Sequence, residues 1–221
     1  MQKNKHILVF SHGFGVRKDD RGLLTDIATA FPEAESVLFD YFDVDEGKKT
    51  ITICPLSSQA KMLNDTIKRV QGVSPGATID LICHSQGTIV AALAKPEGVR
   101  KTILLAPVFD MSIERAMKRY GPLMKLDGVT ELYPLDGYIR FVPPEYWAER
   151  GTLKPFAEYN AFAEKTDIIA IEANQDEIVP KMDLAALSPK VQIISLDGDH
   201  NFTGAAREPL KATLRGLLST E

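Results

Sequence analysis

The chain of 221 residues has few cysteine, histidine and tryptophan residues, and it contains no long apolar run. Its two cysteines, Cys54 and Cys83, do not form a disulfide framework, and we expect both to be free thiols. The longest wholly apolar stretch, residues 89–94, is far shorter than the roughly 18–20 residues that a membrane span requires. The sequence therefore predicts no membrane span.

Charge of either sign is not concentrated in any one segment. The 26 basic and 30 acidic residues give a net charge of -4, and no basic block has the pattern of a phosphate-binding surface. We therefore expect no nucleic-acid partner. Residues 7–10 are too few for the apolar region of a secretion signal, so we expect a cytoplasmic protein. A hydrophobic fraction of 44% and a charged fraction of 25% are typical of a folded globular chain.

Short apolar runs alternate with helical patterns along the chain. This order predicts an α/β fold with a mostly parallel sheet of about six strands and helices on both faces. Ligands of such sheets bind at the carboxyl ends of the strands. The expected strands cover residues 7–10, 36–40, 78–83, 102–106, 167–172 and 191–196, and the expected helices cover residues 23–31, 56–70, 86–94 and 205–218.

One interval, residues 107–165, is longer than a single crossover needs, and we expect it to be an insertion. It divides the predicted core into residues 1–106 and 166–221. Within the insertion, Asp136-Gly137 joins residues 131–135 to residues 138–142, and this pair favours a β-hairpin turn. We expect the insertion to cover the sheet's edge as a lid; the alternative is a surface excursion without a role in chemistry.

Ser85 is the candidate nucleophile. It stands in Cys83-His84-Ser85-Gln86-Gly87, between an expected strand and an expected helix. A sharp turn at this place projects the hydroxyl group, and the helix N-terminus behind it favours negative charge. Gly87 provides the usual glycine two residues after the serine, whereas Cys83 replaces the glycine expected two residues before it. The alternative role for such a serine is a helix cap.

A second loop, residues 12–15 with the sequence His-Gly-Phe-Gly, follows the first expected strand at the same edge. It can direct a backbone N–H at an oxyanion, and we expect Phe14 and Gln86 to supply the two donors. The competing interpretation is a dinucleotide-binding loop, because Gly13 and Gly15 begin a G-x-G-x-x-G pattern. Lys18 occupies the place of the third glycine, which disfavours this interpretation.

The loops after the last two expected strands carry a candidate base and a candidate acid. A serine hydroxyl needs a histidine to take its proton, and the histidine needs an anion that orients it. His200 is the candidate base, because the other three histidines precede the first strand or belong to turns already assigned. Asp176 is the candidate acid, and its rivals are Asp199, Glu177 and Glu172.

These loops resemble those of the α/β-hydrolase superfamily over essentially the whole chain, in the order serine, aspartate, histidine. The matching segments are the oxyanion loop at 12–15, the nucleophile elbow at 84–87, the acid loop at 176–180 and the histidine loop at 199–200. The position of the insertion resembles that in feruloyl and cinnamoyl esterases, in which a hairpin-bearing insertion covers the site. The resemblance implies an α/β-hydrolase fold and a carboxylesterase.

We therefore expect a serine hydrolase that cleaves small or medium acyl esters, aromatic acyl esters included, through an acyl-enzyme intermediate. The expected partner is the small-molecule ester, with no cofactor and no metal; the oligomeric state is not predicted. A thioesterase, a peptidase or a C–C hydrolase would use the same triad, and a non-catalytic small-molecule-binding protein would use the same fold.

Two sets of side chains in the insertion have alternative roles. Its aromatic residues either form an acyl pocket or pack the insertion onto the body. Arg140 and Lys154 either contact a substrate carboxylate or are solvated surface charges, and the second role is favoured. The aromatic residues concerned are Tyr133, Tyr138, Phe141, Tyr146 and Trp147.

Overall fold

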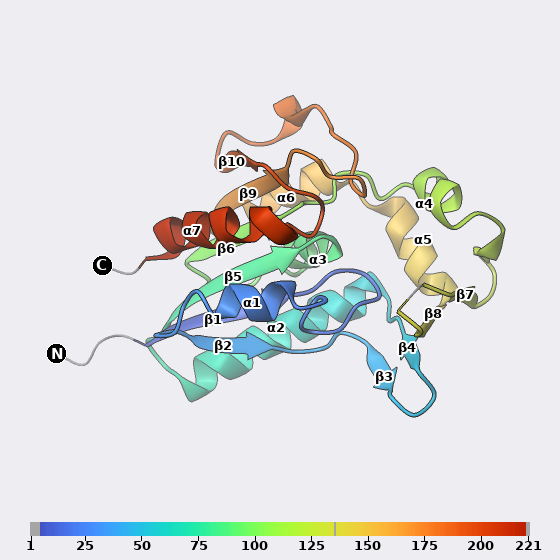
Figure 1. The fold of residues 1–221 in the computed structure, drawn as a ribbon, viewed down its shortest axis with the longest axis horizontal. Coiled ribbons are helices and arrows are strands. Elements are labelled where there is room, and N and C mark those ends of the chain that lie inside the picture. The colour runs from blue at the N-terminus through green and yellow to red at the C-terminus, as the bar shows by residue number, and fades with distance from the viewer. Residues whose placement is uncertain (1–4, 135, 220–221) are drawn as a thin grey trace.

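A six-stranded parallel sheet forms the centre of the computed structural model, which describes residues 5–134 and 136–219 (Figure 1). The strand order is β10-β9-β6-β5-β1-β2, and every neighbouring pair is parallel. The predicted α/β class and parallel sheet are therefore confirmed. The strands are β1 (His6–Ser11), β2 (Glu35–Leu38), β5 (Thr78–His84), β6 (Lys101–Leu105), β9 (Asp167–Ala173) and β10 (Val191–Leu196).

The central strands are apolar along their whole length because their two faces enter two separate cores. Ile7 and Val9 of β1 belong to the core beneath α2, α3 and α6, whereas Leu8 and Phe10 belong to the core beneath α1 and α7. Burial of each such side chain contributes about 1.5–3 kcal/mol. The covering helices are α1 (Leu23–Ala28), α2 (Leu56–Val73), α3 (Gln86–Ala94), α6 (Pro155–Phe162) and α7 (Arg207–Leu218).

The distribution of apolar residues in α2 and α3 matches how deeply each helix is buried. α2 buries one apolar stripe that includes Leu56, Leu63, Ile67 and Val70, and its opposite face is exposed. α3 is apolar on all sides because neighbouring elements cover it, among them α2, α6 and β5. Within residues 5–134 and 136–219, no helix is both long enough and apolar enough to span a bilayer.

The interval 107–165 contains the predicted hairpin. Its strands are β7 (Thr130–Leu132) and β8 (Ile139–Val142), which are antiparallel, with Thr130 opposite Val142. Gly137 has φ +81° in the turn, a backbone conformation that favours glycine. Leu135, the last residue of the predicted strand 131–135, lies outside the described residues. The interval also contains α4 (Ile113–Tyr120), η1 (Gly121–Leu123), α5 (Pro144–Thr152) and α6.

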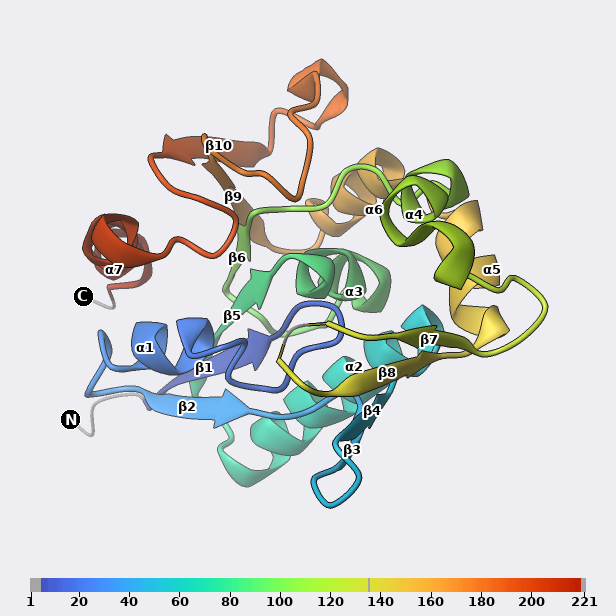
Figure 2. The ribbon, with the colours of Figure 1, turned by 45° about the vertical axis from the view of Figure 1, so that its right-hand side comes forward.

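The hairpin continues into a second sheet that joins the interval to the body. β8 pairs in parallel with β4 (Thr50–Thr52), and β4 pairs with β3 (Asp43–Asp45), so the order is β3-β4-β8-β7. Sequence analysis did not predict β3 or β4, because three-residue strands are too short to show a period. Figure 2 shows the second sheet and α5 beyond the ends toward which the parallel strands run. The interval therefore lies at the carboxyl edge of the main sheet.

α3 lies against β1 at Gly87, and the close approach has no room for a side chain. A Cβ on Gly87 would lie 2.3 Å from the carbonyl oxygen of Ser11. Because this oxygen belongs to the backbone, α3 or β1 must move, and we expect Gly87→Ala to lower the free energy of unfolding by about 1–3 kcal/mol. Urea unfolding followed by circular dichroism measures the change.

Gly72→Ala in α2 is the matched control for this prediction. A Cβ on Gly72 meets no described atom within 4 Å, so we expect this variant to raise the free energy of unfolding by up to about 1 kcal/mol. Equal effects of the two substitutions would contradict the close approach at Gly87.

Candidate active site

Ser85 occupies a strained turn between β5 and α3. Its backbone has φ +52° and ψ -123°, and a residue with a side chain rarely adopts such a φ. The N–H of Ser85 donates to the carbonyl of Leu105 at 2.9 Å, and the hydroxyl of Thr88 donates to the carbonyl of Ser85 at 2.6 Å. The neighbouring strand and the first turn of α3 thus hold the conformation that the predicted nucleophile elbow requires.

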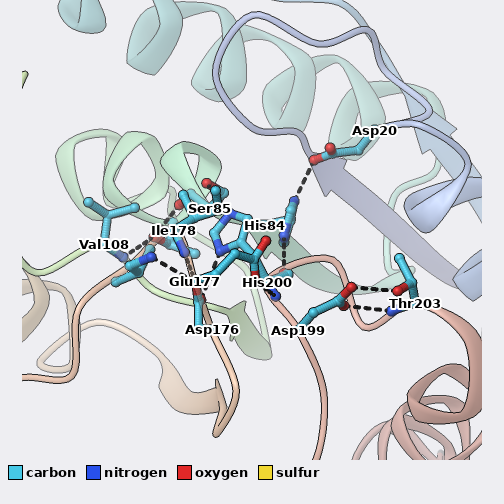
Figure 3. Close-up of polar contacts among 12 residues, drawn as sticks. Asp20, His84, Ser85, Val108, Asp176, Glu177, Ile178, Asp199, His200 and Thr203 are labelled. Carbon is cyan, nitrogen blue, oxygen red and sulfur yellow. Dashed lines mark hydrogen bonds and ion pairs between the residues drawn. The ribbon is translucent and has the colours of Figure 1, made fainter. Parts of the chain in front are cut away.

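His200 lies between Ser85 and Asp176 (Figure 3). Its Nε2 is 2.9 Å from Oγ of Ser85, and its Nδ1 is 2.8 Å from Oδ2 of Asp176. His200 follows β10, and Asp176 follows β9, so both loops stand at the edge where β5 ends. The structure therefore brings together the three residues that sequence analysis selected. With Nδ1–H donated to the carboxylate, Nε2 is free to accept the serine proton.

Local hydrogen bonds keep Asp176 ionised. Burial alone would raise the pKa of Asp176, but the hydrogen bonds from His200 and from two backbone N–H groups outweigh it and lower the pKa. These N–H groups belong to Ile178 and Val179, and each donates to Oδ1 at 2.7 Å. The carboxylate is therefore fixed in position and charged at neutral pH.

The three rival acids have other partners. Asp199 accepts hydrogen bonds from the N–H and the hydroxyl of Thr203 (Figure 3). Glu177 accepts the backbone N–H of His200 at 3.2 Å and thus contacts the main chain of the histidine loop. Glu172 remains within β9, where burial raises its pKa. The carboxylate at Nδ1 of His200 is that of Asp176.

The two predicted oxyanion donors line the pocket into which Ser85 and His200 open. Gln86 is the first residue of α3, so its N–H has no acceptor within the helix. Phe14 lies in the turn after β1, and a Cβ on the preceding Gly13 would lie 3.3 Å from Cβ of Ser85. The loop after β1 therefore approaches the serine closely.

Arg140 of β8 fastens this loop to the second sheet. Its Nε donates to the carbonyl of Gly15 at 2.8 Å, and its remaining nitrogens donate to the Asp136 carboxylate and the Tyr138 carbonyl. The side chain is only 4% exposed. The prediction of a solvated surface charge is therefore wrong for Arg140, because β8 carries it beneath the oxyanion loop. For Lys154 the prediction of an exposed surface charge is confirmed.

Two of the five aromatic residues named in the interval, Tyr146 and Trp147, support the site from outside the pocket. Tyr146 and Trp147 are buried in the core that also contains β1 and β5, and the hydroxyl of Tyr146 donates to Oε1 of Gln86. The ring of Tyr146 lies 5.3 Å from that of Phe14. Among the described residues that line the pocket, the aromatic ones are Phe14 and Tyr120. Of the two alternative roles, the acyl pocket does not form from the five residues named for it, and Tyr146 and Trp147 instead pack the interval onto the body.

Asp20 and His84 form a buried ion pair that sequence analysis missed. Nδ1 of His84 donates to Oδ2 of Asp20 at 2.7 Å, and Nε2 donates to the carbonyl of His200 at 3.0 Å. Both side chains are 2% exposed. Since both ring nitrogens face acceptors, the ring is an imidazolium ion. Asp20 also accepts the N–H of Gly13 at 2.8 Å, so the pair joins the oxyanion loop, the nucleophile elbow and the histidine loop.

The pKa values of the pair reflect this mutual stabilisation. Burial would lower the pKa of His84, but the charge and the hydrogen bond of Asp20 outweigh it and raise the pKa. Burial would raise the pKa of Asp20, but the charge and the hydrogen bond of His84 outweigh it and lower the pKa.

The sequence around Asp20 contains no signal of this pair. The polar run there has no hydrophobic period, and the turn of Asp20, Arg21 and Gly22 has φ values of +48°, +56° and +86°. Only the folded backbone places Asp20 at His84.

We expect Asp20→Asn to lower the free energy of unfolding by about 3–5 kcal/mol, because it leaves a buried imidazolium without its counter-charge. His84 has a raised pKa, so its contribution is complete below about pH 6.5, the pKa of an unperturbed histidine, and is lost as the pH rises through the folded pKa. Asp20 has a lowered pKa, so its contribution is present above about pH 4. The destabilisation should therefore be largest near pH 5.5 and smaller at pH 8, as measured by urea unfolding.

Asp26→Asn is the matched control, because Asp26 pairs with Arg207 and Lys211 on the partly exposed surface. This variant should cost no more than about 1 kcal/mol. A similarly small cost for Asp20→Asn at both pH values would show that the buried pair is not charged.

Comparisons with known proteins match the fold and no sequence family. No protein-family model matches the chain, and no curated protein matches its sequence. Among solved structures, Est1E from Butyrivibrio proteoclasticus has a TM-score of 0.71 at 16% identity, with 97% of this chain and 87% of that chain covered. Another structure of Est1E contains bound ferulic acid.

Two further solved structures show the same similarity. The α/β-hydrolase GrgF from a Penicillium species has a TM-score of 0.72 at 16% identity, covering 98% of this chain and 90% of that chain. An esterase from Pyrococcus furiosus has a TM-score of 0.67 at 15% identity, covering 97% of this chain and 81% of that chain. At this identity the likeness is one of fold, and it extends over nearly the whole chain.

Proposed function

We propose that this chain, which has the predicted α/β-hydrolase fold, is a serine hydrolase that cleaves carboxylic esters through an acyl-enzyme intermediate. The observation that carries the proposal is the hydrogen-bonded series from Ser85 Oγ to His200 at 2.9 Å and from His200 to Asp176 at 2.8 Å. The strained turn that presents Ser85 supports it. The names of two structural neighbours, each described as an esterase or a hydrolase, agree with the proposed reaction class.

In the proposed reaction, Ser85 Oγ attacks the ester carbonyl carbon while Nε2 of His200 takes the hydroxyl proton. The carbonyl oxygen becomes an oxyanion, and the N–H groups of Phe14 and Gln86 donate to it. The tetrahedral intermediate collapses, the bond to the alcohol oxygen breaks, and His200 gives its proton to the leaving alcohol. His200 then takes a proton from water, whose oxygen attacks the acyl-enzyme carbonyl. When this second intermediate collapses, the bond to Ser85 Oγ breaks, His200 returns the proton to Ser85 Oγ, and the acid is released.

Asp176 stabilises the imidazolium that forms on His200 in both steps. Its carboxylate remains ionised because hydrogen bonds lower its pKa, so the positive ring finds a counter-charge already in place. The same hydrogen bond fixes the tautomer whose Nε2 accepts a proton. Asp176 thus contributes charge and orientation and does not itself take the proton.

We also propose that residues 107–165 act as the cap of the site. Val108, Met111 and Tyr120 of this interval line the pocket together with Phe14, and the rings of Tyr120 and Phe14 lie 6.1 Å apart. The cavity measures about 140 Å³, below the roughly 300–1,000 Å³ of a drug-sized ligand site. A cavity of this size favours a small ester, and the apolar part of the cap limits the access of water to the acyl-enzyme.

A fluorophosphonate probe tests the nucleophile without knowledge of the substrate. We expect one adduct on the native chain, measured by intact mass, and none on Ser85→Ala, because the probe reacts only with a serine that a base activates. Ser74→Ala, which removes a serine hydroxyl that accepts from Lys5 just after the end of α2, is the control and should still be labelled. An unlabelled native chain with intact circular dichroism would reject the proposed function.

Asp176 and Glu177 are neighbours in the chain but contact different parts of His200, the ring and the backbone, so substitutions at the two positions test the two contacts separately. We expect Asp176→Asn to lower kcat about 10⁴-fold with little change in KM, because it removes the counter-charge and the correct tautomer. Glu177→Gln is the matched control, since the hydrogen bond that Glu177 makes within the described residues is with the backbone N–H of His200, and it should change kcat less than tenfold. Steady-state hydrolysis of a chromogenic acetate ester measures both, and equal losses would remove Asp176 from its proposed role.

A further inference from the structure

Four arginine side chains line the pocket over Ser85. Arg21 lies in the loop before α1, Arg115 and Arg119 lie one turn apart on α4, and Arg150 lies on α5. Among the described residues that line this pocket, the acidic one is Asp20, whose charge is already paired with His84. The lining of the pocket beyond the catalytic groups is therefore strongly positive.

These arginines differ from four of the six other arginines in having no carboxylate partner among the described residues; Arg69 and Arg215 also have none there. Arg17, Arg100, Arg140 and Arg207 each form an ion pair. In the described part of the chain, none of the four pocket arginines does so. An anion in the pocket would therefore not have to displace an existing carboxylate.

The hydrogen bonds of the pocket arginines also leave donors unused. Arg115 donates to the carbonyl of Ile178. Arg150 donates to Sδ of Met111 at 3.3 Å and, weakly, to the carbonyl of Asp110 at 3.5 Å. Its Nε is buried and has no partner among the described residues. A guanidinium group has five N–H donors, so the cluster retains capacity for an oxyanion.

The positive charges of the pocket arginines repel one another. Burial lowers the pKa of Arg115, and the charges of Arg150 and Arg119 lower it further, whereas Asp110 and Asp176 act in the opposite direction. Asp176 is committed to His200, and Asp110 accepts the N–H of Ser112 at 2.9 Å. Like charges held together beside a partly enclosed cavity attract an anion more strongly than they would in open water.

We propose that the ester hydrolysed at this site carries a second group that is anionic, a carboxylate or a phosphate, and that the arginine cluster binds it. The inference rests on the proposed function and specifies its substrate class. Arginine is suited to this task because its planar fork binds both oxyanions in a bidentate manner. The small cavity places the second anion within a few atoms of the scissile carbonyl.

Matched substrates that differ only in charge test the proposal. Monoethyl succinate and ethyl succinamate have the same chain and shape, but a neutral amide replaces the carboxylate in the second. We expect kcat/KM to be at least about tenfold higher for the acid, and the ratio to fall as salt screens the charge. The pair 3-acetoxypropanoate and 3-acetoxypropanamide places the anion on the alcohol side, and 2-acetoxyethyl phosphate distinguishes phosphate from carboxylate.

Exposed arginines provide variants that spare the fold. Arg119→Gln should reduce the preference for the acid about threefold, and the double variant Arg21→Gln/Arg119→Gln should reduce it further. Lys118→Gln is the matched control, because Lys118 is exposed on the same helix and carries the same charge without lining the pocket. Its preference should equal that of the native chain. An equal loss in Lys118→Gln would show that net charge, rather than the cluster, attracts the substrate.

A binding measurement separates this proposal from the catalytic one. Ser85→Ala should bind monoethyl succinate more tightly than ethyl succinamate in a calorimetric titration, without need of turnover. Equal affinities, together with hydrolysis of the neutral esters, would overturn the anionic substrate and leave the serine hydrolase intact. A native chain that neither hydrolyses an ester nor reacts with the fluorophosphonate would overturn the hydrolase, while the titration would still decide whether the cluster binds anions.

Discussion

The buried ion pair between Asp20 and His84 joins the parts of the site that are farthest apart in the sequence. His84 ends β5 beside the nucleophile, Asp20 holds the N–H of Gly13, and the second ring nitrogen of His84 holds the carbonyl of His200. A charged pair without access to water is stable only while every hydrogen bond is made. The pair therefore fixes three loops in one relative arrangement.

The second sheet provides a comparable constraint on the other side of the oxyanion loop. β8 carries Arg140 to the carbonyl of Gly15, and α5 carries Tyr146 to the side chain of Gln86. Side chains thus tie the interval 107–165 to the loop of Phe14 and to Gln86, and strand pairing with β4 ties it to the body. Its position at the carboxyl edge makes it part of the support of the site as well as one wall of the pocket.

The charges of the site fall into two groups with different surroundings. Asp20 pairs with His84, and Asp176 accepts a hydrogen bond from His200, so both carboxylates have their partners within the protein. The pocket arginines have no carboxylate partner in the part of the chain that the structure describes, and they line the space where a substrate must lie. In the proposed function, the first group performs the proton transfers and the second selects what reaches Ser85.

Strand and helix patterns in the sequence determined the α/β class, the parallel sheet and the placing of Ser85, Asp176 and His200 after successive strands. This was possible because buried strands leave continuous apolar runs, and the carboxyl ends of parallel strands meet at one edge. Only the tertiary structure decided that Arg140 is buried, that Asp20 faces His84, and that the arginines of α4 and α5 meet over the serine. Each of these contacts joins residues that are distant in the chain and carry no local period, so their partners exist only once the sheet and the interval 107–165 have folded together.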